Sequence, residues 1–254
     1  MPEQKNDHFT VVLSRLANEA ESYGNELKEN GITVITIPFI YIKPIEDEIS
    51  RMTDLLKSEV KFDWIVFTSK TAVEIVCQRA LSYLNLPYLN FASVGPATTE
   101  ALSLYGHKVS YESCGQNADS LAEEISNKFN FKNQLVLLPL SKSAKQGMEL
   151  TLNSAGAMVR RYDIYEPAAK ILTQAEIDAV LRSDLVCYFS PSAVRSIVNQ
   201  TDGRVLNINS LAIGPITFRE LEKFNFKKIS VCDNVSVDAL KEQVLILKNK
   251  KSID

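Results

Sequence analysis

An internal repeat is the feature of this sequence that most limits its fold. Four segments of the first half of the chain recur, in the same order, in the second half. The matched pairs are Val11–Gly31 with Val136–Gly156 in apolar spacing, DWIVFTSKTAV at 63–73 with DLVCYFSPSAV at 184–194, VGPAT at 94–98 with IGPIT at 213–217, and ADSL at 118–121 with VDAL at 237–240. Any two βα units share strand and cap signals, but four segments in one order favour a duplicated fold. We therefore predict two lobes of similar structure.

Short apolar runs alternate with amphipathic stretches along both halves. The runs VVLSR, ITVITIPFI, WIVFTS, LVLLPL and LVCYFS are typical of buried strands, and the stretches between them have helical spacing. Glycines stand where the predicted helices should end, at Gly31, Gly106 and Gly156. This alternation predicts an α/β protein in which each lobe is a parallel sheet flanked by helices.

Composition and missing motifs exclude several classes of function. The net charge is −3 and no basic stripe with interleaved aromatics occurs, so we expect no nucleic-acid ligand. The four cysteines form no CxxC pair and only two histidines occur, so we expect no metal centre and reduced thiols in the cytoplasm. The chain has no glycine-rich nucleotide motif and no nucleophile elbow, so we expect no organic cofactor. The polar start, MPEQKNDHFT, and the lack of a long apolar run predict a protein without a membrane span.

The repeated motifs place small polar residues at the strand-to-helix turns, which is where open α/β sheets bind ligands. Ser69 and Ser190 follow apolar strands and are natural N-caps of the helices after them. Thr98 and Thr217 stand in the first turn of helices that begin with Gly-Pro. Free backbone N–H groups at such turns suit carboxylate or phosphate ligands. Residues of these types are also plain caps in many proteins, and both interpretations stay open here.

Because the chain is slightly acidic, a ligand with many carboxylates would have to be held by oriented amides and a few local cations. Arg15, Lys70 and Arg195 stand at the predicted turns and are the candidate cations. The residues alone thus indicate a bilobal, anion-binding α/β protein, and they do not identify a reaction.

Taken in order, the segments resemble the uroporphyrinogen-III synthase family over about Val11 to Leu240. The resemblance rests on VVLSRLANEAESYGNELKENGITVITIPFIYI, DWIVFTSKTAVEIV, ASVGPATTEALSLYG, GQNADSLAEEI, YDIYEP, CYFSPSAVRSIV and AIGPITFREL. It implies two α/β lobes joined by a two-stranded hinge. The implied parts are lobe 1 with residues 1–39 and 168–254, lobe 2 with residues 43–161, and hinge strands around 38–42 and 162–167.

The resemblance also implies a reaction. Members of the family close hydroxymethylbilane, a linear tetrapyrrole rich in carboxylates, into uroporphyrinogen III with loss of water and inversion of ring D, in haem biosynthesis. Pyrrole nitrogens supply the electron push, so the resemblance implies a hydro-lyase that needs no cofactor. It further implies a cytoplasmic monomer whose partner is the tetrapyrrole substrate, and it leaves open a hand-over from the preceding pathway enzyme.

The same resemblance assigns roles to individual residues. Tyr165 matches a cleft tyrosine whose phenol donates a proton or a hydrogen bond to the leaving hydroxyl, although a buried structural tyrosine is the other interpretation. The hydroxyls that match the family's substrate-binding loops are Ser69, Thr98, Ser190, Ser192 and Thr217. Leu140 departs from the family pattern, because many relatives have an arginine there, and Lys142 or Lys145 would have to compensate.

A second hypothesis comes from another class of protein. Two hinged α/β lobes also serve non-enzymatic receptors and sensors that bind small anions, and a fold alone does not settle function. Tyr165 on the crossing segment distinguishes the two hypotheses, because a protein that only binds its ligand has no need of a proton donor there.

Overall fold

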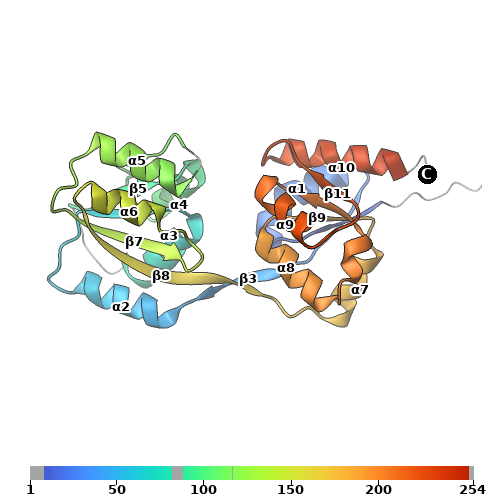
Figure 1. Ribbon diagram of the computed structural model, residues 1–254, viewed down its shortest axis with the longest axis horizontal. Helices are drawn as coiled ribbons and strands as arrows, with labels where there is room; N and C mark the ends of the chain where they lie inside the picture. Colours follow the sequence, from blue (N-terminus) through green and yellow to red (C-terminus); the bar gives the residue numbers. More distant parts are fainter. Residues whose placement is uncertain (1–8, 82–87, 116, 252–254) are drawn as a thin grey trace, which may run out of the picture. The chain divides into compact units, whose positions relative to one another are not determined.

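The chain passes twice between two structural units, once after Tyr41 and once after Glu166. A computed structural model describes residues 9–81, 88–115 and 117–251 (Figure 1). Unit 1 holds the described residues up to Tyr41 and from Pro167 onward, and unit 2 holds those from Ile42 to Glu166. Each unit contains a sheet and a core of its own.

Unit 1 is built on a five-stranded sheet with the order β11-β10-β9-β1-β2, in which all neighbours are parallel. Helices α7, α8 and α9 contribute to the core on one face of this sheet, and α1 and α10 to the core on the other. In chain order the elements are β1 (Thr10–Leu13), α1 (Ala17–Glu29), β2 (Thr33–Thr36), α7 (Gln174–Arg182), β9 (Leu185–Tyr188), α8 (Pro191–Gln200), η2 (Arg204–Asn207), β10 (Asn209–Ala212), α9 (Pro215–Lys223), β11 (Ile229–Val231) and α10 (Val237–Lys251).

Unit 2 is built on a six-stranded sheet with the order β3-β8-β7-β4-β5-β6. Helices α2, α3 and α4 cover one face, and α5 and α6 pack side by side on the other (Figure 1). In chain order the elements are β3 (Ile40–Pro44), α2 (Glu46–Lys57), β4 (Trp64–Phe67), α3 (Lys70–Arg79), β5 (Asn90–Ser93), α4 (Pro96–Leu104), β6 (Tyr111–Glu112), α5 (Ala118–Lys128), β7 (Leu135–Ser141), α6 (Gly147–Ser154) and β8 (Met158–Ala169). The outer strand β3 and its neighbour β8 contain the points at which the chain passes between the units.

The two sheets repeat one arrangement. The order β6-β5-β4-β7-β8 of unit 2 corresponds to β11-β10-β9-β1-β2 of unit 1, and α1 packs on α10 as α6 packs on α5. The N-terminal β1–α1 segment therefore takes the place in unit 1 that β7–α6 takes in unit 2, as the match of Val11–Gly31 with Val136–Gly156 predicts. The predicted α/β class with parallel, helix-flanked sheets is confirmed.

Alternating side chains of each central strand enter the cores on opposite faces of its sheet. In β4, Ile65 and Phe67 belong to one buried cluster, whereas Trp64 and Val66 belong to the other. Strands buried on both faces need continuous apolar sequence, which is why WIVF reads as an unbroken run. Burial of one large apolar side chain stabilises a fold by about 1.5–3 kcal/mol, so both faces contribute to each unit.

The three predicted helix ends are confirmed, and one predicted strand is divided in two. Gly31, Gly106 and Gly156 follow helices with positive φ, as predicted for helix ends. The apolar run ITVITIPFI forms two strands instead of one, because Pro38 has no N–H for a ladder hydrogen bond. The chain leaves the first sheet at Thr36 and enters the second at Ile40.

Candidate functional site

The turn after β4 carries the first two predicted site residues. The Ser69 Oγ accepts a hydrogen bond from the Ala72 N–H at 3.1 Å, so the predicted N-cap of α3 is confirmed. Lys70 is the first residue of α3, and its ammonium lies 3.6 Å from the Glu74 carboxylate one turn further along. The Lys70 side chain is 61% exposed, so this exposed pair adds little stability and the ammonium stays accessible to a ligand.

Tyr165 reaches the same turn from β8. Its hydroxyl lies 2.8 Å from the Ser69 Oγ. A shift in the β7–β8 register after Leu140 pairs Ser141 with Tyr165, and Ile164 becomes an extra residue of β8. As a result the consecutive residues Ile164 and Tyr165 both enter the same buried cluster, where an ordinary strand would send them to opposite faces.

The Tyr165 side chain combines a buried ring with a hydrogen-bonded hydroxyl. The residue is only 8% exposed. Burial raises the pKa of Tyr165 above its usual value, and the hydrogen bond with Ser69 partly opposes this rise. The phenol therefore keeps its proton at neutral pH and can act as a hydrogen-bond donor or a weak acid.

The two predicted threonines occupy equivalent buried positions. Thr98 in α4 and Thr217 in α9 are each 4% exposed, in the first turns after the Gly-Pro pairs. The first turn of α4 is tied to β5 by the neighbouring Thr99, whose Oγ1 lies 2.7 Å from the Ser93 Oγ. The threonine side chains thus lie within the packed first turns, and a binding role for them stays a prediction.

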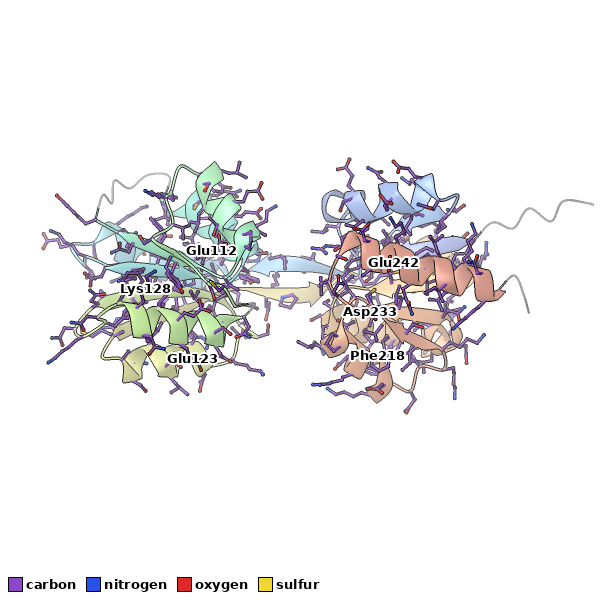
Figure 2. The ribbon with its side chains drawn as sticks, turned by 90° about the horizontal axis from the view of Figure 1, so that it is seen from above. Glu112, Glu123, Lys128, Phe218, Asp233 and Glu242 are labelled. Atoms are coloured by element: carbon purple, nitrogen blue, oxygen red, sulfur yellow. The ribbon has the colours of Figure 1, made fainter. Side chains whose placement is uncertain are left out.

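A hollow of about 540 Å³ opens at the carboxyl ends of β4 and β7. Thr68, the first turn of α5, and Lys145 contribute to its lining, and Glu123, which Figure 2 labels on α5, lies at it too. Asp119 and Glu123 supply two negative charges against the one positive charge of Lys145. An anionic group here would have to be held by backbone amides at the start of α5, because the side-chain charges do not favour it.

Leu140, where the family resemblance implies an arginine, lies near the end of β7, before the loop that carries Lys142 and Lys145. Leu140 is buried, at 2% exposure. The Lys142 ammonium lies 3.4 Å from the Glu166 carboxylate, and the Lys43 ammonium lies 3.9 Å from the same group. Lys145 lines the hollow, so of these two lysines it is Lys145 that stands at a ligand-sized space, and compensation for the missing arginine stays a prediction.

Arg161 is a residue that sequence reasoning missed. Its guanidinium donates to the Ala144 carbonyl at 3.0 Å and to the Asp163 carboxylate at 2.8 Å, and it lies 3.8 Å from Glu149. With its side chain only 16% exposed, Arg161 fixes the loop that presents Lys145. The sequence feature that could have pointed to Arg161 is its place in β8, next to β7, which lacks the arginine that the family resemblance implies.

In unit 1, the predicted residues of α8 gather around an acidic partner. The Ser190 Oγ accepts the Ala193 N–H at 3.2 Å, which confirms the predicted N-cap. Arg195 donates to the Ser192 Oγ at 3.2 Å and to the Glu220 carboxylate of α9 at 2.6 Å. The structure thus brings Ser192 and Arg195 together, with the arginine already paired.

Glu220 also accepts a hydrogen bond from Lys223 at 3.1 Å. Burial alone would raise the pKa of Glu220, but the hydrogen bonds and charges of Arg195 and Lys223 outweigh it and hold the pKa below its usual value. The sequence analysis did not single out Glu220. The feature that could have pointed to it is its place in α9, one turn after Thr217 of the repeated motif.

Arg15 lies after β1 and stacks on aromatic rings. Its guanidinium carbon is 5.2 Å from the ring centre of Phe189 and 5.9 Å from that of Tyr23. Such cation–π contacts hold an arginine in place without removing its charge. The predicted residues therefore fall in both units, and within unit 2 the pair that comes into contact is Ser69 with Tyr165.

No three His, Cys, Asp or Glu side chains within residues 9–81, 88–115 and 117–251 are grouped so as to hold a metal ion. Each helix in them is too short or too polar to cross a membrane.

The family model that matches this chain and the relatives that resemble it carry the same name. Residues 21–242 match the family model described as uroporphyrinogen-III synthase HemD. The uroporphyrinogen-III synthase of Synechococcus elongatus is 26% identical over 242 residues, which cover 87% of this chain and 89% of that protein. The enzyme of the same name from Chlorobaculum parvum is 26% identical over 231 residues, which cover 86% and 90%.

Solved structures give the same fold. The uroporphyrinogen-III synthetase of Helicobacter pylori superposes with a TM-score of 0.63 at 17% identity and covers 94% of this chain and 99% of that one. A mutant uroporphyrinogen III synthase from Thermus thermophilus gives a TM-score of 0.59 at 16% identity, with 95% and 99% covered. The matching family is one of enzymes, so the comparisons do not favour the receptor or sensor hypothesis.

Proposed function

Because the chain belongs to the uroporphyrinogen-III synthase family, we propose that it cyclises hydroxymethylbilane to uroporphyrinogen III, with loss of water and inversion of ring D. The family consists of cyclising enzymes of porphyrin and haem biosynthesis that act on a small tetrapyrrole. The observation that carries the assignment to a reaction is the protonated Tyr165 phenol, held 2.8 Å from Ser69 at the carboxyl end of β4.

In this proposal Tyr165 is the general acid. Its proton passes to the terminal hydroxyl of the substrate, which leaves as water, while the lone pair of the adjacent pyrrole nitrogen fills the electron gap and an azafulvene forms. A substituted carbon of ring D attacks the azafulvene, and the resulting spiro intermediate fragments and recloses with that ring inverted. A proton that leaves a pyrrole nitrogen when an azafulvene forms returns to nitrogen, because the product keeps its four N–H groups. Reclosure at the free carbon of ring D releases the hydrogen of that carbon as a proton, which restores the phenol. The substrate supplies every electron pair, so the enzyme is a hydro-lyase without a cofactor.

Selectivity in the proposal comes from binding. Unassisted closure joins the two chain ends by the nearest carbon, so the enzyme has to hold the chain with ring D turned. We assign substrate carboxylates to the strand-to-helix turns of both units, at the residues Arg15, Ser69, Lys70, Thr98, Ser190, Ser192, Arg195 and Thr217. The Arg195 charge is shared with Glu220, so backbone amides at the helix starts carry much of the binding.

The cellular setting is part of the same proposal. We propose a cytoplasmic monomer in which the two units act as lobes joined by the hinge strands β3 and β8. None of the four cysteines is joined in a disulfide, which suits a reducing compartment. Because the substrate closes by itself to the wrong isomer, direct hand-over from the preceding enzyme would favour the correct product.

The test is the isomer formed from freshly prepared hydroxymethylbilane. Purified protein should give the type III ring, and heat-denatured protein the symmetric type I ring that forms spontaneously. Chromatography of the oxidised products separates the two. Type I alone at every protein concentration would refute the proposed reaction.

A further inference from the structure

We propose that Ser69 is a positioning residue for the reaction: its hydroxyl donates a hydrogen bond to the Tyr165 oxygen and leaves the phenol proton free for the leaving hydroxyl of the substrate. This inference rests on the proposed function, in which Tyr165 is the acid. It changes the role expected for Ser69 from a substrate contact to a residue that acts through Tyr165.

Either hydroxyl can donate across the contact between Ser69 and Tyr165, and the other contact of the Ser69 oxygen leaves its proton available for the proposed direction. A serine hydroxyl has one proton and two lone pairs. One lone pair of the Ser69 Oγ accepts the Ala72 N–H at 3.1 Å, because Ser69 caps α3. The proton is then available to the Tyr165 oxygen at 2.8 Å. In the opposite direction the phenol proton would point at Ser69, and Tyr165 would have nothing to give to a substrate.

Both partners of this hydrogen bond are anchored by backbone hydrogen bonds. On the serine side, the cap fixes Ser69 to the start of α3. On the tyrosine side, the Tyr165 carbonyl accepts the Lys142 N–H at 2.8 Å, and the Ile164 carbonyl accepts the Ile45 N–H at 3.0 Å. A donor held in this way stays aligned without reorganisation during the reaction, which is what makes a positioning residue effective.

The same hydrogen bond helps after the proton has left. When Tyr165 gives its proton to the leaving hydroxyl, the products are water and a phenolate. The Ser69 O–H then donates to a charged oxygen, and hydrogen bonds to charged groups are stronger than those to neutral ones. The hydrogen bond is therefore stronger in the transition state than in the ground state, so its loss should lower kcat and leave KM nearly unchanged.

The experiment compares Ser69→Gly, Ser69→Thr, Tyr165→Phe and the double variant Ser69→Gly/Tyr165→Phe by steady-state kinetics. Glycine is a tolerated N-cap, so Ser69→Gly removes the hydroxyl at little cost to α3. Threonine keeps both the hydroxyl and the cap. Ser58→Ala is the matched control in unit 2, because the Ser58 hydroxyl also bridges a helix end, between the Leu55 carbonyl and the Val60 N–H.

We expect Ser69→Gly to lower kcat about threefold to tenfold, the range for the difference between a hydrogen bond to a charged oxygen and one to a neutral oxygen, with KM within about twofold of the original. Ser69→Thr should restore kcat, and Ser58→Ala should leave both constants unchanged. In the Tyr165→Phe background the Ser69→Gly change should have less than about a twofold effect, because the group through which it acts is gone.

The outcomes separate this inference from the proposed function. A slow Tyr165→Phe variant together with a Ser69→Gly variant at the original rate overturns the positioning role and leaves the acid in place. If Ser69→Gly lowers kcat equally in both backgrounds, or raises KM, Ser69 is a substrate contact. This result also overturns the positioning role. Original kinetics in Tyr165→Phe refute the acid itself.

Discussion

The repeated aspartates Asp63 and Asp184 should each stabilise their own unit through one side-chain hydrogen bond. The Asp63 carboxylate accepts the Leu135 N–H at 2.8 Å, and the Asp184 carboxylate accepts the Thr10 N–H at 2.8 Å. In both cases the backbone N–H of the aspartate donates to the same neighbour, at 2.9 Å. Each aspartate thus joins the start of one central strand to the start of the next, and Asp63→Ala removes half of that link.

The magnitude follows from the chemistry of the lost bond. A hydrogen bond to a charged group contributes about 1.5–3 kcal/mol, and the Leu135 N–H is left without its acceptor in a partly buried position. We expect Asp63→Ala to lower the free energy of unfolding of unit 2 by about 2 kcal/mol. Asp63→Asn keeps an uncharged oxygen acceptor and should cost about half as much.

The assay uses the single tryptophan of the chain. Trp64 follows Asp63 directly, is 3% exposed and lies in the core of unit 2, so its fluorescence in urea reports the unfolding of that unit. Asp54→Ala, on the exposed face of α2, removes the same charge without such a contact and serves as the control. An Asp63→Ala variant within about 0.5 kcal/mol of the original protein, or an Asn variant as unstable as the Ala variant, would refute the reasoning.

Three further predictions concern turnover without metal, the ion pairs of Glu220 and the burial of the thiols. Chelators should leave turnover unchanged, because the proposed reaction draws its electrons from pyrrole nitrogens; turnover lost on chelation and restored by added metal would contradict this. Arg195 and Lys223 hold the pKa of Glu220 below its usual value, so its contribution to stability is present above about pH 4.5 and is lost as pH falls through the folded pKa. Glu220→Gln should therefore reduce the difference in urea stability between about pH 7 and about pH 3.5, and an unchanged difference would count against the ion pair. A thiol reagent should label Cys114 alone in the folded protein and all four cysteines after unfolding. The other three thiols are buried, and burial raises the pKa of Cys77 to about 12. Labelling of a second thiol in the folded protein as fast as that of Cys114 would be inconsistent with this core.

The repeat was sufficient to predict the turns of both units, because caps and helix ends depend on neighbours in sequence. Ser69 and Ser190 cap α3 and α8 as their positions after apolar strands predict. The helices after the two Gly-Pro pairs begin at Pro96 and Pro215. Each of these features is decided within one helical turn, and local pattern is enough to find it.

Contacts made across the fold were not visible in the pattern. The hydrogen bond between Ser69 and Tyr165 depends on the extra residue Ile164 in β8, and a bulge has no reliable sequence signal. The pairing of Arg195 with Glu220 depends on how α8 packs against α9. The sequence predicts Arg195 as a cation at a turn, and only the packing of α8 on α9 reveals that Glu220 already shares its charge.

Duplication supplied two similar scaffolds, but the proposed acid occurs in one of them. The offset that aligns Val11 with Val136 aligns Ile40 with Tyr165, or Phe39 once the extra residue Ile164 is allowed for. Both are apolar, so the first half of the sequence has no phenol at this point. Ser190 keeps the cap of Ser69, since every helix start needs an acceptor for its free N–H groups. The serines therefore recur for a structural reason that holds in both copies, whereas the hydroxyl opposite them does not recur. In the proposed reaction the two copies share the task of binding, and the acid belongs to unit 2 alone, where the extra residue Ile164 brings Tyr165 to the cap of α3.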